Sequence, residues 1–257
     1  MAQLQRLAIA QAQIQNQQIA LTPQQQHYLS RVLRLREGDR FIAMDGLGSW
    51  WLAQLAGTSA EILEPILADT ELPVSVTLMV ALPKGNGFDE VVRSCTELGV
   101  ACIAPVVSDR TLLHPSPQKL ERWRRIAAEA AEQSERQIVP TILDPVPFPT
   151  ALSGVIGRTL EEGLHPTSNA NDLQYICVAR GDSPHLLDCL QDKGLVTNDS
   201  GQINITIAIG PEGGWTDSEV EQAIAHGLKP VSLGRRILRA VTAPIVALSI
   251  AAAAYKG

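Results

Sequence analysis

The sequence predicts an α/β protein with two domains: a small β-barrel domain, and then a larger domain built on a parallel sheet. Short alternating strands around one helix occupy the first part of the chain, a pattern typical of a small barrel. Continuous apolar runs at residues 74–82, 100–107 and 203–209 indicate strands buried on both faces, as in parallel sheets. Helical patterns alternate with these runs, as in βαβ units. We therefore expect domains at residues 1–72 and 73–257.

The first domain should hold one helix and a set of strands. Thr22 can cap this helix, Pro23 suits its first turn, and Gln25 completes a capping box. We expect the helix to carry His27, Tyr28, Arg31 and Val32 and to break before Gly38. Strands are predicted at residues 40–44, 50–55 and 60–67, with a glycine-containing hairpin turn at residues 45–48.

The second domain should alternate strands and helices. A helix at residues 88–98 ends at Gly99, and another begins at Ser116-Pro117 and runs to about residue 137. Thr216 and Glu219 form a capping box for a helix that ends at Gly227. The other predicted elements are strands at residues 175–179 and 230–233, a last helix at 242–255, and loops at 163–172 and 191–202.

Composition limits the possible classes of protein. The chain is 45% hydrophobic and 19% charged, which suits a folded domain, and its longest apolar stretch is too short to span a bilayer. No signal peptide is recognisable, so we expect a cytoplasmic protein without membrane contact. The four cysteines form no CxxC pair and should be buried reduced thiols, with no metal site.

Basic residues gather in two places although the net charge is −6. Residues 27–40 hold four arginines, and residues 231–257 hold three arginines and a lysine without any acid. Such clusters are a possible RNA surface or simply solvated arginines. Composition alone leaves both interpretations open.

Two glycine loops follow predicted strands and are the strongest candidates for a ligand site. They span residues 209–215 (IGPEGGW) and 233–239 (LGRRILR), and a third strand end lies at residues 179–182. Ligands of parallel sheets bind at the carboxyl ends of strands, where glycines let backbone groups approach closely. Ordinary strand-to-helix turns are the alternative. The GxGxxG, P-loop, GxSxG and HExxH motifs are missing from the sequence, which disfavours a nucleotide-binding oxidoreductase and the hydrolase classes.

Six segments in a fixed order resemble a known family. They are residues 27–35 with Gly38-Asp39, Pro83-Lys84-Gly85, residues 96–100, residues 130–134 with Arg136, residues 209–214, and Leu233-Gly234 with residues 236–239. Together they resemble the bacterial 16S rRNA uridine N3-methyltransferases of the SPOUT superfamily, and the likeness runs nearly from end to end.

This resemblance implies a fold, a cofactor and partners. The first domain would be a PUA-like RNA-binding barrel, and the second a SPOUT domain whose chain end forms a trefoil knot, an exception among folds. The enzyme would be a homodimer that methylates a uridine in 16S rRNA of the small ribosomal subunit with S-adenosylmethionine (SAM). SAM would contact Ala179, Arg180, Ile209, Gly210, Gly213, Gly214, Leu233, Gly234, Ile237, Leu238, Thr242 and Ala243.

Candidate residues for catalysis and for RNA binding complete this interpretation. Arg239 could stabilise negative charge on the uracil carbonyls, or instead support the loops through an ion pair. Glu212 is the nearest carboxylate that could accept a proton, or it orders its loop by accepting backbone N–H bonds. The RNA-binding candidates are His27, Arg31, Arg34, Lys84, Arg110 and Arg136.

The chain departs from the family pattern at two positions. Val241 stands where an acidic residue is usual, and Asp109 replaces a glutamate. No catalytic role is therefore assigned to position 241. Two rival functions remain open: a SPOUT methyltransferase for another RNA position, and a non-catalytic RNA-binding assembly factor.

Overall fold

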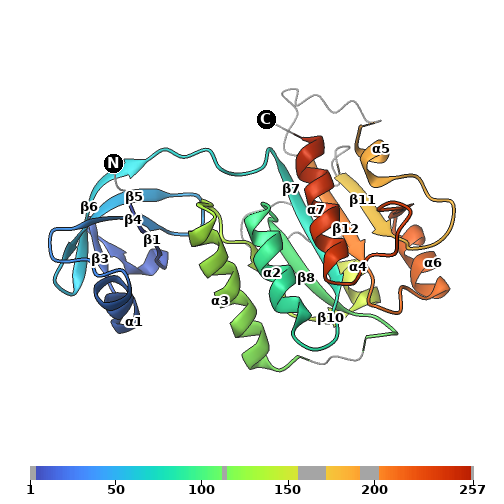
Figure 1. Ribbon diagram of the computed structural model, residues 1–257, viewed down its shortest axis with the longest axis horizontal. Helices are drawn as coiled ribbons and strands as arrows, with labels where there is room; N and C mark the ends of the chain where they lie inside the picture. The colour runs from blue at the N-terminus through green and yellow to red at the C-terminus, as the bar shows by residue number, and fades with distance from the viewer. Residues whose placement is uncertain (1–3, 112–114, 156–171, 192–202, 256–257) are drawn as a thin grey trace. The chain divides into compact units, whose positions relative to one another are not determined.

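The computed structural model describes residues 4–111, 115–155, 172–191 and 203–255, and it divides into two compact units (Figure 1). Unit 1 comprises Met1–Glu71 and Ala128–Val139, and unit 2 comprises Leu72–Ala127 and Pro140–Gly257. The division near residue 72 lies where the sequence suggests a domain boundary. Residues 128–139 differ, because they pack with unit 1 although the sequence pattern places them in the second domain.

Unit 1 is built on a curled, mostly antiparallel sheet, with six strands in the described part of the chain. Their order is β1-β4-β5-β6-β3-β2, and only the β1–β4 pair is parallel among these pairings. The bounds are β1 Arg6–Ala8, β2 Ile14–Gln15, β3 Gln18–Ala20, β4 Arg40–Met44, β5 Trp50–Ala56 and β6 Ser59–Ile66. Strands β4, β5 and β6 confirm the three strands that the sequence predicts in this domain. The first three, and the turn η1 (Gln11–Gln13), were not predicted.

The helix of unit 1 begins as the sequence predicts. Thr22 Oγ1 accepts the Gln25 N–H at 3.2 Å, and Gln25 Oε1 accepts the Thr22 N–H at 2.9 Å, which confirms the capping box. Helix α1 (Pro23–His27) continues into one π-helical stretch, η2 (Tyr28–Val32). Arg34 then has a φ of +59°, so the helical backbone ends well before Gly38.

A partly buried ion pair helps to hold residues 128–139 in unit 1. Helix α3 (Pro117–Gln133) ends earlier than expected, and Glu135 has a φ of +61°. The Arg136 guanidinium pairs with the Glu71 carboxylate, which also accepts the Gln137 N–H at 2.9 Å. These bonds fix the end of the helix within the unit that contains Glu71.

Unit 2 contains a sheet in which all observed strand pairs are parallel, as predicted. The order among described residues is β10-β8-β7-β12-β11-β13, with β9 beside β8. The strands are β7 Val74–Ala81, β8 Cys102–Val107, β9 Thr141–Ile142, β10 Val146–Pro147, β11 Asp172–Cys177, β12 Ile203–Ile209 and β13 Lys229–Val231. The short strands β9 and β10 were missed, and the predicted loop positions 163–171 and 192–202 lie outside the described residues.

Helices cover both faces of this sheet. Helices α2 (Gly87–Glu97) and α7 (Thr242–Ala254) lie on the same side of it (Figure 1). Helices α4 (Phe148–Val155) and α6 (Asp217–Ala225) pack against β8 and β13 and bury a core around Met79, Phe148 and Ile176. Helix α5 (Leu186–Gln191) packs against α7. The predicted helices α2, α6 and α7 are confirmed, whereas α4 and α5 were not predicted.

The structure also bears on two predictions from composition, the state of the cysteines and the lack of a membrane-spanning segment. All four cysteines are free; Cys95 is buried as predicted, whereas Cys102, Cys177 and Cys189 are only partly buried. Burial raises the pKa of the Cys95, Cys102 and Cys177 thiols to about 12. These three thiols therefore stay protonated at neutral pH. Of the helices in the described chain, none combines the length and apolarity needed to cross a bilayer.

Candidate active site

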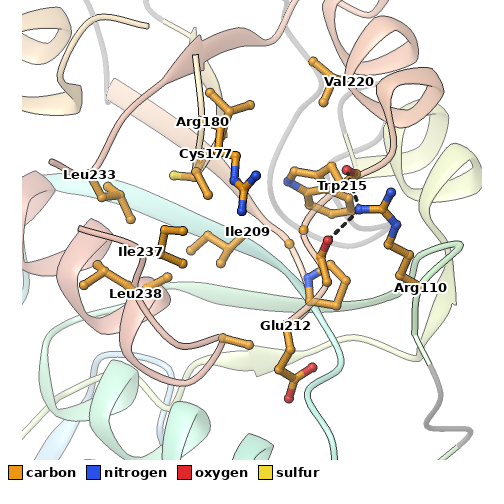
Figure 2. A pocket seen from close by; sticks show the side chains of 18 of the residues that line it. Arg110, Cys177, Arg180, Ile209, Glu212, Trp215, Val220, Leu233, Ile237 and Leu238 are labelled. Atoms are coloured by element: carbon orange, nitrogen blue, oxygen red, sulfur yellow. Dashed lines mark hydrogen bonds between the residues drawn. The ribbon is translucent and has the colours of Figure 1, made fainter. Parts of the chain in front are cut away.

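Three loops meet in a pocket of about 730 Å³ at the carboxyl ends of adjacent strands (Figure 2). They follow β11, β12 and β13, which are neighbours in the order β12-β11-β13. The two glycine loops singled out in the sequence therefore face the same cavity. Its volume lies within the range of roughly 300–1,000 Å³ that is typical of small-molecule sites.

The pocket brings together nearly all the residues expected to contact a cofactor. Those that line it are Ala179, Arg180, Ile209, Gly210, Gly213, Gly214, Leu233, Gly234, Ile237, Leu238 and Ala243. Thr242 is the exception: it is the first residue of α7, it is exposed, and its N–H donates to the Arg239 carbonyl at 2.9 Å. Thr242 thus helps to begin a helix beside the pocket rather than forming its wall.

The first glycine loop depends on close packing around residues without side chains. Gly214 has a φ of +71°, and its N–H closes a turn to the Pro211 carbonyl at 2.8 Å. A Cβ on Gly210 would lie 3.2 Å from Trp215 Nε1, so the indole lies directly over this glycine. Trp215 in turn stacks on Phe148 with ring centroids 4.3 Å apart. Both contacts fix the indole that forms one wall of the pocket.

Trp215 is a pocket residue that the sequence interpretation missed. The only available signal was an aromatic residue directly after a glycine run, and its partner Phe148 lies in a helix that was not predicted. Cys177 and Arg236 also line the pocket without having been proposed as cofactor contacts.

The second glycine loop forms an apolar wall. Leu233, Ile237 and Leu238 lie on one side of the cavity in Figure 2, with Ile209 beside them. Ile237 is 66% exposed. Gly234 has a φ of +115° and open space where a Cβ would stand. This side of the cavity offers apolar surface together with accessible backbone.

The two catalytic candidates occupy different places. The Glu212 carboxylate accepts the Lys84 N–H at 2.9 Å, and Figure 2 shows it directed away from Ile209 and Ile237. This bond supports the loop-ordering interpretation of Glu212. Arg239 is exposed, and its carbonyl accepts the N–H groups of Thr242 and Ala243 at 2.9 Å each. It lies on the same loop as the pocket residues Leu238 and Ala240.

The six RNA-binding candidates do not share one environment. Five candidates are exposed: His27, Arg31, Arg34, Lys84 and Arg110. Arg110 lines the pocket and donates hydrogen bonds to the carbonyls of Gly213 and Trp215. Arg136 is 4% exposed and is paired with Glu71, so its guanidinium has no surface to offer a phosphate. We correct that assignment: Arg136 is a structural residue of unit 1.

Comparison with known proteins gives the family. Residues 70–252 match an RNA methyltransferase domain family, and residues 21–64 match an RNA methyltransferase PUA domain family. The chain is 49% identical to the ribosomal RNA small subunit methyltransferase E of Synechocystis sp., over 95% of this chain and 76% of that protein. It is 30% identical to the protein of the same name from Bacillus subtilis, over 90% and 88% of the two chains.

Solved structures agree with this assignment. A ribosomal RNA small subunit methyltransferase E from Neisseria gonorrhoeae, bound to SAM, matches with a TM-score of 0.78, 29% identity and 96% coverage of both chains. A methyltransferase from Legionella pneumophila in complex with SAM matches with a TM-score of 0.79, 25% identity and 98% coverage of both. The chain therefore belongs to the ribosomal RNA small subunit methyltransferase E family.

Proposed function

We propose that this protein uses SAM to methylate N3 of a uridine in the 16S rRNA of the small ribosomal subunit. The observation that carries the proposal is the pocket formed by the loops after β11, β12 and β13. Family membership supports the reaction class, and relatives with the same fold bind SAM.

The pocket suits the parts of SAM. Its volume of about 730 Å³ is sufficient for a ligand of this size. The wall of Leu233, Ile237 and Leu238 offers apolar surface to a purine ring, and the glycine backbones offer donors and acceptors to its edge and to hydroxyl groups. We propose that these residues, with Ile209 and Ala243, hold the cofactor.

The chain's own residues have two tasks in the reaction. When bound, SAM supplies an electrophilic methyl group. The uracil N3 is a poor nucleophile until it loses its proton, and the negative charge then spreads to the two ring carbonyl oxygens. We propose that the Arg239 guanidinium stabilises this charge, since it lies on the loop that lines the pocket. Holding the uracil N3, the methyl carbon and the SAM sulfur in line supplies the remaining rate enhancement.

Glu212 is the weaker candidate for accepting the N3 proton. Its carboxylate already binds the Lys84 N–H at 2.9 Å. This bond joins the loop after β7 to the loop after β12, which is a positioning role. We leave the general base unassigned.

We propose RNA binding by unit 1, and Lys84 is a separate RNA-binding candidate in unit 2. His27, Arg31 and Arg34 are exposed on or directly after α1 and η2. Guanidinium groups bind phosphate oxygens with paired hydrogen bonds. The PUA-domain match over residues 21–64 supports this surface, because it includes all three side chains.

Three further properties belong to the same proposal. We propose a cytoplasmic homodimer in which the last part of the chain threads a loop to form a trefoil knot. Helix α7 is apolar around its circumference, and residues such as Ile245, Val246 and Ile250 are only partly buried in the single chain. A second copy covering this surface would bury them.

The test is methyl transfer to small subunits that lack the mark, followed by mapping of the modified nucleotide. A single N3-methyluridine in 16S rRNA is the expected product. A methyl group on a ribose or on another base would establish the first rival function. No SAM binding in calorimetry would favour a non-catalytic assembly factor.

A further inference from the structure

Arg110 lies in the loop after β8 and reaches across to the first glycine loop. Its Nη1 donates to the Gly213 carbonyl and, at 3.3 Å, to the Trp215 carbonyl (Figure 2). The two carbonyls flank Gly214, whose positive φ turns the chain at this point. One guanidinium thus holds both sides of the turn that precedes the pocket's aromatic wall.

A second set of bonds ties the same two loops together. The carboxylate of Glu219, which is 3% exposed, accepts the Asp109 N–H at 2.9 Å and the Thr216 N–H at 2.8 Å. Thr216 Oγ1 also donates to the Asp109 carboxylate at 3.2 Å. The loop of Asp109 and Arg110 is therefore anchored to the start of α6, which places the Arg110 side chain against the glycine loop.

The glycine at position 213 makes this approach possible. A Cβ there would lie 3.1 Å from Arg110 Cδ, closer than ordinary contact. Any larger residue would push the arginine stem away from the carbonyls that it binds. The absence of a side chain at Gly213 thus lets Arg110 reach the loop backbone and also leaves that backbone accessible to a ligand.

We infer that Arg110 is a positioning residue of the SAM pocket: it fixes the 213–215 backbone, and through it the Trp215 wall, before the cofactor enters. This inference rests on the proposed use of the pocket for SAM. Hydrogen bonds from a charged donor are stronger than neutral ones. A loop held in its binding conformation loses less entropy when the ligand binds.

The test measures SAM affinity by calorimetry in the absence of RNA. Arg110→Met keeps much of the stem and removes the donors, so SAM should bind about tenfold or more weakly. Arg110→Lys retains one charged donor and should recover part of the affinity. Arg93→Met, at an exposed arginine on α2, is the matched control and should bind like the wild type.

Two further readouts separate positioning from other roles. With saturating SAM, kcat of Arg110→Met should return to within about threefold of the wild type, and the salt dependence of RNA binding should not change. In a double-mutant cycle, Arg110→Met should cost much less in a Gly213→Ala background, because the alanine already displaces the arginine.

The outcomes distinguish this inference from the proposed function. If the wild type binds no SAM, the use of the pocket fails. If the wild type binds SAM and both Arg110 variants bind it equally well, only the positioning role is refuted. If Arg110→Met does not fold, the comparison of Arg110→Lys with wild type decides: an unchanged SAM affinity overturns the inference, and a several-fold loss supports it.

Discussion

The glycines of the pocket act through their backbone, beside walls formed by the side chains of Trp215, Leu233 and Ile237. Gly210, Gly213, Gly214 and Gly234 all line the cavity, and each gives access that a side chain would obstruct. Charged residues such as Arg110, Arg180 and Arg236 line the pocket, whereas Arg239 lies just outside its wall. This makes Arg239 the most informative residue for testing catalysis rather than cofactor binding.

Replacing Arg239 with alanine should lower kcat by about 10²-fold, the usual effect of losing one donor to a developing oxyanion. SAM affinity should stay unchanged, because Arg239 is not part of the pocket wall. Steady-state kinetics with small subunits and calorimetry with SAM check the two parts. Normal turnover would remove Arg239 from the mechanism.

Glu132 in unit 1 should make stability depend on pH. Burial raises the pKa of Glu132, the Ala8 N–H that it accepts lowers it, and nearby Glu129 raises it further. Because the folded state holds the Glu132 proton more tightly, the contribution of Glu132 to stability is greatest below the ordinary carboxyl range and is lost as pH rises through the raised pKa.

Glu132→Gln, which keeps an acceptor for Ala8, should therefore be more stable than wild type at neutral pH. The difference should vanish in acid, where both side chains are neutral. Urea unfolding at several pH values measures this difference in the free energy of unfolding. An equal loss of stability at every pH would show that the charge of Glu132 is not the cause.

At the residue level, the sequence predicted the pocket better than the charged contacts. Glycine loops after apolar strands are local signals, so Gly210 and Gly234 could be recognised directly. The role of an arginine depends on partners far along the chain. Arg136 pairs with Glu71, and Arg110 with Gly213, and neither partner can be read from local sequence.

At the scale of elements, each strongly patterned helix and strand was predictable, and the weakly patterned ones were not. Thr216 with Glu219 and Thr22 with Gln25 set helix starts through short-range bonds. By contrast, β1 to β3 are two or three residues long and interrupted by glutamines, so pairing with β4 and β6 determines them. Tertiary contacts override local propensity in such segments.

The cap of α6 gives a prediction at this scale. Thr216→Ala removes the acceptor for the Glu219 N–H and the bond to Asp109. The free energy of unfolding should fall by about 1 kcal/mol, as is typical for a lost N-cap. The Thr216→Ser variant, which keeps the hydroxyl, should retain most of the stability that the cap contributes. Chemical denaturation of both variants measures the difference, and an unchanged Thr216→Ala protein would refute the structural role of the cap.

At the scale of the molecule, we propose that unit 1 binds RNA and that unit 2 holds the cofactor. Arg31→Gln and Arg34→Gln in unit 1 should weaken RNA binding in a salt-dependent manner. Each lost phosphate contact should reduce the salt slope by about 0.7–0.9. RNA binding measured across a salt series, with Arg93→Gln as control, checks this. Unchanged affinity and slope in the double variant would contradict the proposed surface.

The central claim concerns unit 2: the loops after β11, β12 and β13 enclose SAM. Calorimetric titration of SAM into Gly234→Ala tests it most directly. Gly48→Ala is the matched control, because Gly48 in unit 1 has a φ of +113° against +115° at Gly234, and at both positions an added Cβ would meet open space. We predict wild-type affinity in Gly48→Ala and at least tenfold weaker binding, roughly 1.4 kcal/mol, in a folded Gly234→Ala protein. Equal affinity in the two variants would contradict the claim.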